Sequence, residues 1–156
     1  MKLNLGCGDE RLEGWVNVDL RSDIADVVAD VRHLSFADSS ADEILAQDIL
    51  EHFSVDETLS ILREWGRVLI PEGFLTLRVP NMHKLAQGIV EHRDDPFLYT
   101  LIENIYGGHR WGPGGSWDAH HWGFTPGSLH RVLEDAGFAV LTFDEEYNFT
   151  TLAVWT

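Results

Sequence analysis

The feature that most constrains the fold is a short strand that runs straight into a glycine turn. Residues 2–5, KLNL, alternate polar and apolar side chains, and Gly6-Cys7-Gly8 follows at once. Glycines at the end of a strand let the backbone turn tightly and let a ligand approach the main chain, because no Cβ intervenes. Ligands of open α/β sheets bind at the carboxyl ends of strands. The start of the chain therefore predicts a ligand site at the end of the first strand.

Further strands are predicted from short apolar runs. The runs at 15–20, 26–30 and 42–47 are separated by Gly, Asp and Ser, and alternation predicts another strand over 74–79. The last residues, from 138 onward, hold two more apolar runs around a short polar turn, which predicts a β-hairpin.

Two helices carry both a start and a stop signal. A capping box begins the first, an N-cap followed by proline begins the second, and Gly or Pro ends each. The signal residues are Ser54, Glu57, Pro71 and Gly73 for the first helix and Thr125, Pro126 and Gly137 for the second.

The order of these elements predicts the fold class. We expect an α/β domain over 1–156, with a doubly wound, mostly parallel, seven-stranded sheet and an antiparallel last strand. Residues 81–124 would be an inserted substrate or lid region, helical over 81–106, followed by a Gly-, Trp- and His-rich loop at 107–124.

Composition excludes several partners and compartments. The formal net charge of −15 repels nucleic acid and anionic membranes. The chain has one cysteine, Cys7, and shows neither a leader nor an apolar run long enough to span a bilayer, so we expect a cytoplasmic protein.

Two acidic residues complete a ligand-binding pattern. Asp19 ends the second predicted strand and Asp30 the third, so a glycine turn and two strand-end carboxylates come in the order that an adenosine ligand needs. With these residues the chain resembles the class I S-adenosylmethionine-dependent methyltransferases. LNLGCG is similar to the glycine motif of that family, LSFADSSADEILAQDILEHF to its fourth-strand segment, and LREWGRVLIPEGFLTLRVPN to the helix and strand that follow.

The resemblance implies S-adenosylmethionine as cofactor and an in-line methyl transfer. The acidic surface and the aromatic loop favour a small neutral or cationic molecule, or a sugar, as acceptor. The resemblance also implies ribose binding by Asp19 and adenine recognition by Asp30 and Val31, and the full cofactor set would be Asn4, Gly6, Cys7, Gly8, Asp19, Leu20, Asp30, Val31 and Gln47. The chain departs from the family at Asn4, where many members have an acid, and at Glu10, where many have a third glycine. If the acceptor is a hydroxyl, His52 or His121 is the candidate general base.

Other functions remain open at this point. A non-catalytic S-adenosylmethionine-binding module in regulation or assembly would carry the same motifs. A nucleotide-dependent oxidoreductase is disfavoured, because Arg11 stands where the NAD fingerprint requires glycine. We expect no metal at the histidines of the loop, which would instead line a substrate cleft with its tryptophans: His109, His120, His121, Trp111, Trp117 and Trp122.

The spacing of the first strands predicts missing helices. Only six residues separate Gly8 from Trp15 and seven separate Asp19 from Val27, whereas a parallel crossover takes a dozen or more. We therefore expect turns in place of helices between strands 1 to 4. The apolar residues Leu3, Leu5, Val16, Val18, Val27 and Val28 are expected to point to both sheet faces. Without those helices one face of the sheet would expose its apolar side chains to solvent. We expect a second copy of the chain to cover this face in a homodimer, in preference to residues 81–124 folding back over it.

Overall fold

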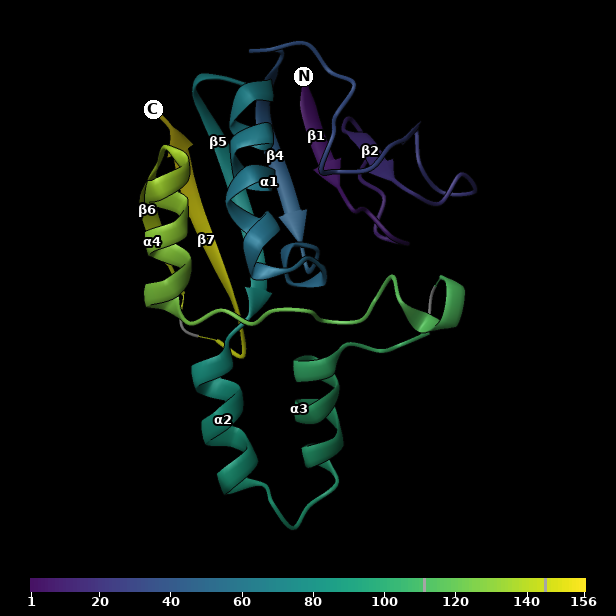
Figure 1. Cartoon of the computed structure of the whole chain (residues 1–156), viewed down its shortest axis with the longest axis vertical. Helices are drawn as coiled ribbons and strands as arrows, with labels where there is room; N and C mark the ends of the chain where they lie inside the picture. The colour runs from purple at the N-terminus through teal and green to yellow at the C-terminus, as the bar shows by residue number, and fades with distance from the viewer. Residues whose placement is uncertain (111, 145) are drawn as a thin grey trace.

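The computed structural model describes residues 1–110, 112–144 and 146–156, and its centre is a seven-stranded sheet (Figure 1). The strand order is β3-β2-β1-β4-β5-β7-β6, and β7 runs antiparallel to both of its neighbours. The other pairings are parallel, as predicted. The order reverses between β1 and β4, which is the switch point where ligands of such sheets bind. The strands are β1 (Lys2–Leu5), β2 (Val16–Asp19), β3 (Val27–Val28), β4 (Ala41–Gln47), β5 (Leu69–Pro80), β6 (Phe138–Phe143) and β7 (Asn148–Trp155).

Four α-helices accompany the sheet, and their caps confirm the sequence signals. The Glu57 carboxylate accepts hydrogen bonds from the Ser54 backbone N–H at 3.1 Å and the Ser54 hydroxyl at 2.7 Å. Thr125 caps α4 by accepting from the Ser128 N–H, and Gly137 ends that helix at φ 110°. The helices are α1 (Val55–Val68), α2 (Met82–Glu91), α3 (Phe97–Tyr106) and α4 (Pro126–Ala136), with 3₁₀ turns at Leu50–His52 and Pro113–Gly115.

Two predicted boundaries are wrong. Helix α1 ends at Val68, upstream of Pro71, because a residue before proline disfavours the helical backbone and Leu69 is already extended. Strand β5 begins at Leu69 and includes the predicted stop residues. Strand β3 spans only two residues, since the Asp30 carboxylate accepts the Arg32 N–H and turns the chain.

The core lies on one face of the sheet, beneath α1 and α4 (Figure 1). The register pairs Leu3 with Val16, Leu5 with Val18, and Val18 with Val27, so these side chains all point to this one face. Of the six apolar residues expected on both faces, Val28 is the one that points to the other face, and it is 56% exposed. None of the helices in the described part of the chain lies on the opposite face, and the connections between β1, β2 and β3 are turns, as predicted.

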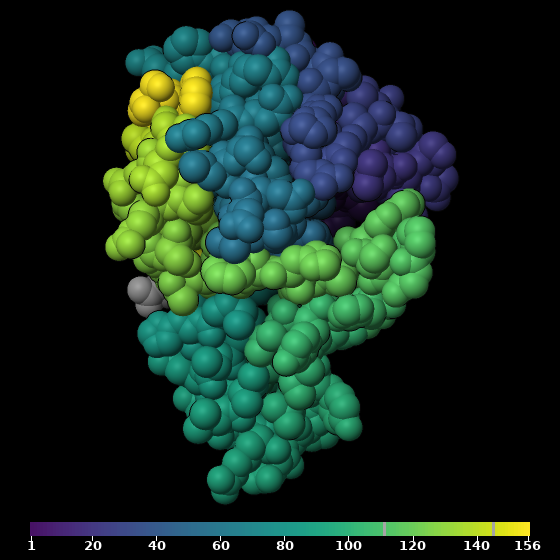
Figure 2. Space-filling model, in the orientation of Figure 1, coloured from purple at the N-terminus to yellow at the C-terminus, as the bar shows by residue number. Residues whose placement is uncertain are grey.

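Residues 81–124 leave the sheet at its carboxyl edge and cover neither face. Helices α2 and α3 form a hairpin that extends away from the strands. The chain then returns to α4 through residues 112–124, called the return segment below, which runs across the ends of the strands (Figures 1 and 2). Bridges from Asn81 to Phe124 and from Gly107 to Ala119 fix this path. None of the helices in the described ranges has the length and apolar character that a bilayer span requires.

Candidate functional site

The glycine turn after β1 has the conformation that the sequence predicts. Gly6 and Gly8 adopt φ +62° and +50°, a region that L side chains avoid. A Cβ on Gly6 would lie 2.7 Å from Ile49 Cγ1, whereas one on Gly8 would meet no atom within 4 Å. Gly6 is thus required by packing against the segment after β4, and Gly8 leaves open space beside the turn.

The carboxylate of Asp19 holds this turn in place. Its Oδ2 accepts the Gly8 N–H at 2.9 Å and its Oδ1 accepts the Arg21 N–H at 2.9 Å. Each carboxylate oxygen has two acceptor positions, so one position on each remains for a ligand hydroxyl.

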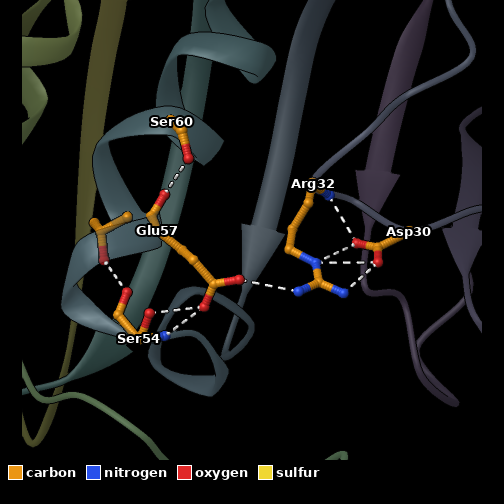
Figure 3. A network of polar contacts seen from close by, with 6 residues as sticks. Asp30, Arg32, Ser54, Glu57 and Ser60 are labelled. Carbon is orange, nitrogen blue, oxygen red and sulfur yellow. Dashed lines mark hydrogen bonds and ion pairs between the residues drawn. The ribbon is translucent and has the colours of Figure 1, made fainter.

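Asp30 belongs to a network that links β3 to α1 (Figure 3). The Arg32 guanidinium bonds both oxygens of Asp30, at 3.0 and 2.7 Å, and donates to Glu57 at 2.9 Å. Its hydrogen bonds lower the pKa of Asp30, and the hydrogen bonds from Ser54 and Arg32 lower the pKa of Glu57. Both groups are therefore carboxylates at neutral pH, and the network fixes Asp30 beside the cavity described next.

A cavity of about 280 Å³ lies at the carboxyl ends of the first strands. Eight residues named from the sequence line it: Gly6, Gly8, Asp19, Leu20, Asp30, Val31, His52 and Trp117. The other lining residues are apolar, basic or acidic: Ala29, Ile49, Phe53, Arg21, Arg32, Asp9, Asp48 and Asp118. The cavity thus combines carboxylates with apolar surface.

Three predicted cofactor residues lie elsewhere. Asn4, Cys7 and Gln47 line a second cavity of about 290 Å³, which shares Gly6 and Gly8 with the first. The glycine turn therefore stands between two cavities, and only the first holds the strand-end acids. Burial raises the pKa of the Cys7 thiol, which agrees with a spacer rather than a nucleophile.

Asn4 has a structural task that its position in the glycine motif did not suggest. It is buried, and its amide donates to the Glu10 carbonyl at 2.9 Å and to Asn17 Oδ1 at 3.0 Å. Asn17 in turn donates to Asp26 Oδ2 at 2.8 Å, and Asp26 pairs with Arg11. This chain of polar groups holds together the turns that replace the missing helices.

The histidines lie in different environments. Both ring nitrogens of His52 face backbone carbonyl oxygens, those of Ala119 at 3.0 Å and Asp48 at 2.9 Å. His121 is exposed and is not among the residues that line the first cavity, although its backbone N–H donates to the Glu51 carbonyl at 2.8 Å. His109 is exposed as well, and Trp111 lies outside the described residues.

Glu51 and His120 are site residues that the sequence did not single out as a pair. Glu51 is fully buried beneath the return segment, and burial raises its pKa well above the usual range. Burial and the neighbouring His52 lower the pKa of His120 to about 4. The string Leu50-Glu51-His52 together with the pair His120-His121 was the only signal, because their proximity depends on the path of the return segment.

Comparisons with known proteins agree with this geometry. Residues 9–77 match a family model described as a methyltransferase domain. A SAM-dependent methyltransferase from Methanosarcina mazei superposes with a TM-score of 0.70 at 22% identity, covering 99% of this chain and 91% of the other. No curated protein matches the sequence.

Two further solved structures are similar. The 1,6-didemethyltoxoflavin-N1-methyltransferase of Burkholderia thailandensis, solved with 1,6-didemethyltoxoflavin and S-adenosylhomocysteine, has a TM-score of 0.67 at 17% identity, with 99% of this chain and 70% of that one covered. A SAM-dependent methyltransferase from Archaeoglobus fulgidus has a TM-score of 0.65 at 18% identity, with 98% and 85% covered.

Proposed function

We propose that this chain is a class I S-adenosylmethionine-dependent methyltransferase and that it methylates a small-molecule or sugar acceptor, and the match of residues 9–77 to a methyltransferase-domain model supports this. The observation that carries the proposal is the cavity at the switch point between β1 and β4, which unites the glycine turn with Asp19 and Asp30. When bound there, S-adenosylmethionine supplies an activated methyl group on a sulfonium cation.

The residues of the cavity fit the parts of that cofactor. Asp19 has an acceptor position free on each oxygen for the two ribose hydroxyls. Ile49, Phe53 and Val31 offer apolar surface for adenine, and Asp30 beside them is held as a hydrogen-bond acceptor by Arg32. The methionine end would lie toward the second cavity, with Gly6, Gly8, Asn4, Cys7 and Gln47 around it.

The acceptor class follows from charge and space. A net charge of −15 disfavours nucleic acid, and the return segment leaves cavities of small-molecule size at the sheet edge. The Burkholderia relative, solved with a small heterocycle, sets a precedent for such an acceptor on this fold. The unpaired Cys7 fits a reducing compartment, so we place the protein in the cytoplasm.

The chain itself contributes orientation. Trp117 and Asp118 of the return segment line the first cavity, where they would help to hold the reacting groups together. His52 lies in the wall of this cavity and is the candidate base for a hydroxyl acceptor, with His121 as the second candidate.

Cofactor binding tests the site residues directly. Replacing Asp19→Ala removes the charge-assisted hydrogen bonds to ribose, about 1.5–3 kcal/mol, so the affinity for S-adenosylhomocysteine is expected to fall about tenfold to a hundredfold. Isothermal titration calorimetry measures it, with Asp94→Ala on the exposed α2–α3 turn as the matched control. Equal affinity in both variants refutes the role of Asp19.

Catalysis needs a separate experiment, because a non-catalytic module would bind the cofactor equally well. Incubation with methyl-labelled S-adenosylmethionine and pooled small-molecule acceptors is expected to transfer label to an acceptor. Tight cofactor binding without any transfer would favour the regulatory or assembly role.

We also propose a homodimer through the helix-free face of the sheet. The register places Leu45, Phe74, Leu152 and Val154 on that face, and Phe74 is 43% exposed. Sedimentation equilibrium at micromolar concentration is expected to give twice the monomer mass, and Phe74→Asp is expected to abolish the dimer. Val90→Asp, an exposed apolar position on α2, serves as the control. A monomer at all concentrations contradicts this interface.

A further inference from the structure

The buried carboxylate of Glu51 has no hydrogen-bond partner among the described residues. Both of its oxygens are inaccessible to solvent, and neither meets a donor. Burial of an unpaired polar group costs several kcal/mol, so groups of this kind in folded proteins are paired with a donor or a cation. Glu51 therefore calls for a partner that residues 1–110, 112–144 and 146–156 do not provide.

His120 presents a lone pair to this carboxylate. Its Nδ1 lies 3.0 Å from the Asn104 carbonyl oxygen, which only accepts, so Nδ1 carries the ring proton. The unprotonated Nε2 then lies 3.9 Å from Glu51 Oε1, too far for a hydrogen bond. An imidazole whose other nitrogen donates to a backbone carbonyl has the arrangement of a metal-ligating histidine.

His52 supplies the third group. Its ring packs edge-on against His120 with the centroids 4.9 Å apart. Its two ring nitrogens lie 3.0 and 2.9 Å from the carbonyl oxygens of Ala119 and Asp48, and a metal ion would take the place of the proton at one of them. Ligand atoms of Glu51, His52 and His120 all lie within 4.8 Å of one another.

We propose that Glu51, His52 and His120 bind one divalent transition-metal ion, for which Zn²⁺ is the probe. Zinc bonds to histidine nitrogen and carboxylate oxygen are about 2.0–2.2 Å long, so an ion can contact both Nε2 of His120 and Oε1 of Glu51 across 3.9 Å. Two imidazoles and a carboxylate suit Zn²⁺ and its first-row neighbours better than Mg²⁺, which prefers oxygen ligands.

The surroundings of the three ligands also favour a cation. A polar cavity of about 300 Å³ borders Glu51 and His120. Of the other acidic residues in its wall, Asp48 pairs with Arg78 and Glu103 pairs with Arg110, so neither is available to neutralise a cation in place of Glu51. Asn148 lines the same cavity, and its buried Oδ1 has no hydrogen-bond partner in the part of the chain that the structure describes. The unpaired groups at this place are therefore acceptors, which a metal ion with its waters satisfies.

The location suggests what the ion does, and this part rests on the proposed methyl transfer. His52 lines the cofactor cavity and Glu51 lines the polar cavity, so the ion would lie where the two meet. Three protein ligands leave a coordination position open. An oxygen or nitrogen of the acceptor bound there would be fixed in place and made easier to deprotonate. In that arrangement His52 would act as a ligand of the ion and not as the general base.

Metal binding is measured without reference to activity. The full chain, freed of metal with a chelator, is titrated with Zn²⁺ by calorimetry, and Co²⁺ is added in parallel to record visible d–d absorption. We expect one ion per chain in the wild type. In Glu51→Gln and His120→Gln the Zn²⁺ affinity is expected to fall at least about tenfold, since even outer-shell changes cost that much. His83→Gln, an exposed histidine on α2, is the matched control.

The outcomes separate this proposal from the methyltransferase assignment. Absence of stoichiometric Zn²⁺ binding in the wild type overturns the metal site, as does equal affinity in Glu51→Gln and His83→Gln. S-adenosylhomocysteine affinity of the chelated protein is recorded alongside, because it tests the cofactor cavity and is expected to persist. If one of the two ligand variants unfolds, as judged by circular dichroism, the other carries the comparison.

Discussion

Replacing Asn4→Asp tests the polar network that holds the shortened connections. The substitution installs the acid that many class I methyltransferases have at this position, with almost no change in side-chain shape. In this chain, however, the Asn4 amide donates to the Glu10 carbonyl and to Asn17 Oδ1. An ionised carboxylate has no hydrogen for either contact and would face two acceptors in a site that is only 4% exposed.

The cost of this substitution has an upper bound. The introduced carboxyl can avoid a buried charge by remaining protonated in the folded state. For a carboxyl with an ordinary pKa near 3.9, protonation at pH 7 costs about 4 kcal/mol. A protonated carboxyl donates one hydrogen bond where the amide donated two, which costs about 1 kcal/mol more. We therefore expect the variant to lose up to about 5 kcal/mol of unfolding free energy at neutral pH.

The pH dependence provides the sharper test. The buried carboxyl has a folded-state pKa above its unfolded value, so the stability of the variant is highest below pH 4 and falls as the pH rises toward the folded-state pKa. Asn4→Ala also loses both hydrogen bonds, about 1–3 kcal/mol, but by an amount that does not change with pH. Urea unfolding followed by tryptophan fluorescence at pH 4.5 and 7.5 measures both variants against the wild type at each pH. Wild-type stability of Asn4→Asp at pH 7.5, or an equal loss at the two pH values, refutes the network.

Three other predictions use different parts of the molecule. Gly6→Ala is expected to lower the affinity for S-adenosylhomocysteine in calorimetry, because the new Cβ would lie 2.7 Å from Ile49 Cγ1. The control is Gly14→Ala, which also has a positive φ but lies in open space and is expected to leave the affinity unchanged. Gly66→Ala is expected to cost about 1–3 kcal/mol in thermal unfolding, since its Cβ would lie 2.3 Å from the Trp155 ring, and an unchanged melting temperature contradicts this packing. The loop at 107–124 is expected to be mobile without ligand and to gain hydrogen-exchange protection when cofactor and acceptor are both bound, and equal protection in the two states would make the loop a fixed scaffold.

The sequence predicted the parts of the fold whose signals are local. The turn at Gly6 and Gly8 and the caps at Ser54 and Thr125 depend on neighbouring residues alone, and the structure has them as predicted. The sequence did not predict that the apolar side chains of β1 and β2 share one face of the sheet. That depends on the register between the two strands, which aligns Leu3 with Val16 and cannot be read from either strand alone.

In the candidate site, too, the residues that depend on local sequence could be predicted and those that depend on distant segments could not. Asp19 and Asp30 follow their strands directly, so their place at the sheet edge was readable from the chain. Glu51 was missed because its burial is produced by a segment about seventy residues downstream, whose N–H groups at His121 and Trp122 bond to the Glu51 carbonyl. No local pattern distinguishes a buried glutamate of this kind from a solvated one.

The position of β7 in the sheet has a consequence for how the chain folds during synthesis. Strand β5 has β4 on one side and β7 on the other, and Phe74 pairs with Val154 across eighty residues of sequence. Until residues 148–155 leave the ribosome, the nascent chain carries β5 as an open edge, and β6 has no strand to join. Open strand edges recruit other chains, so the period between synthesis of β5 and of β7 is when this protein is most exposed to aggregation.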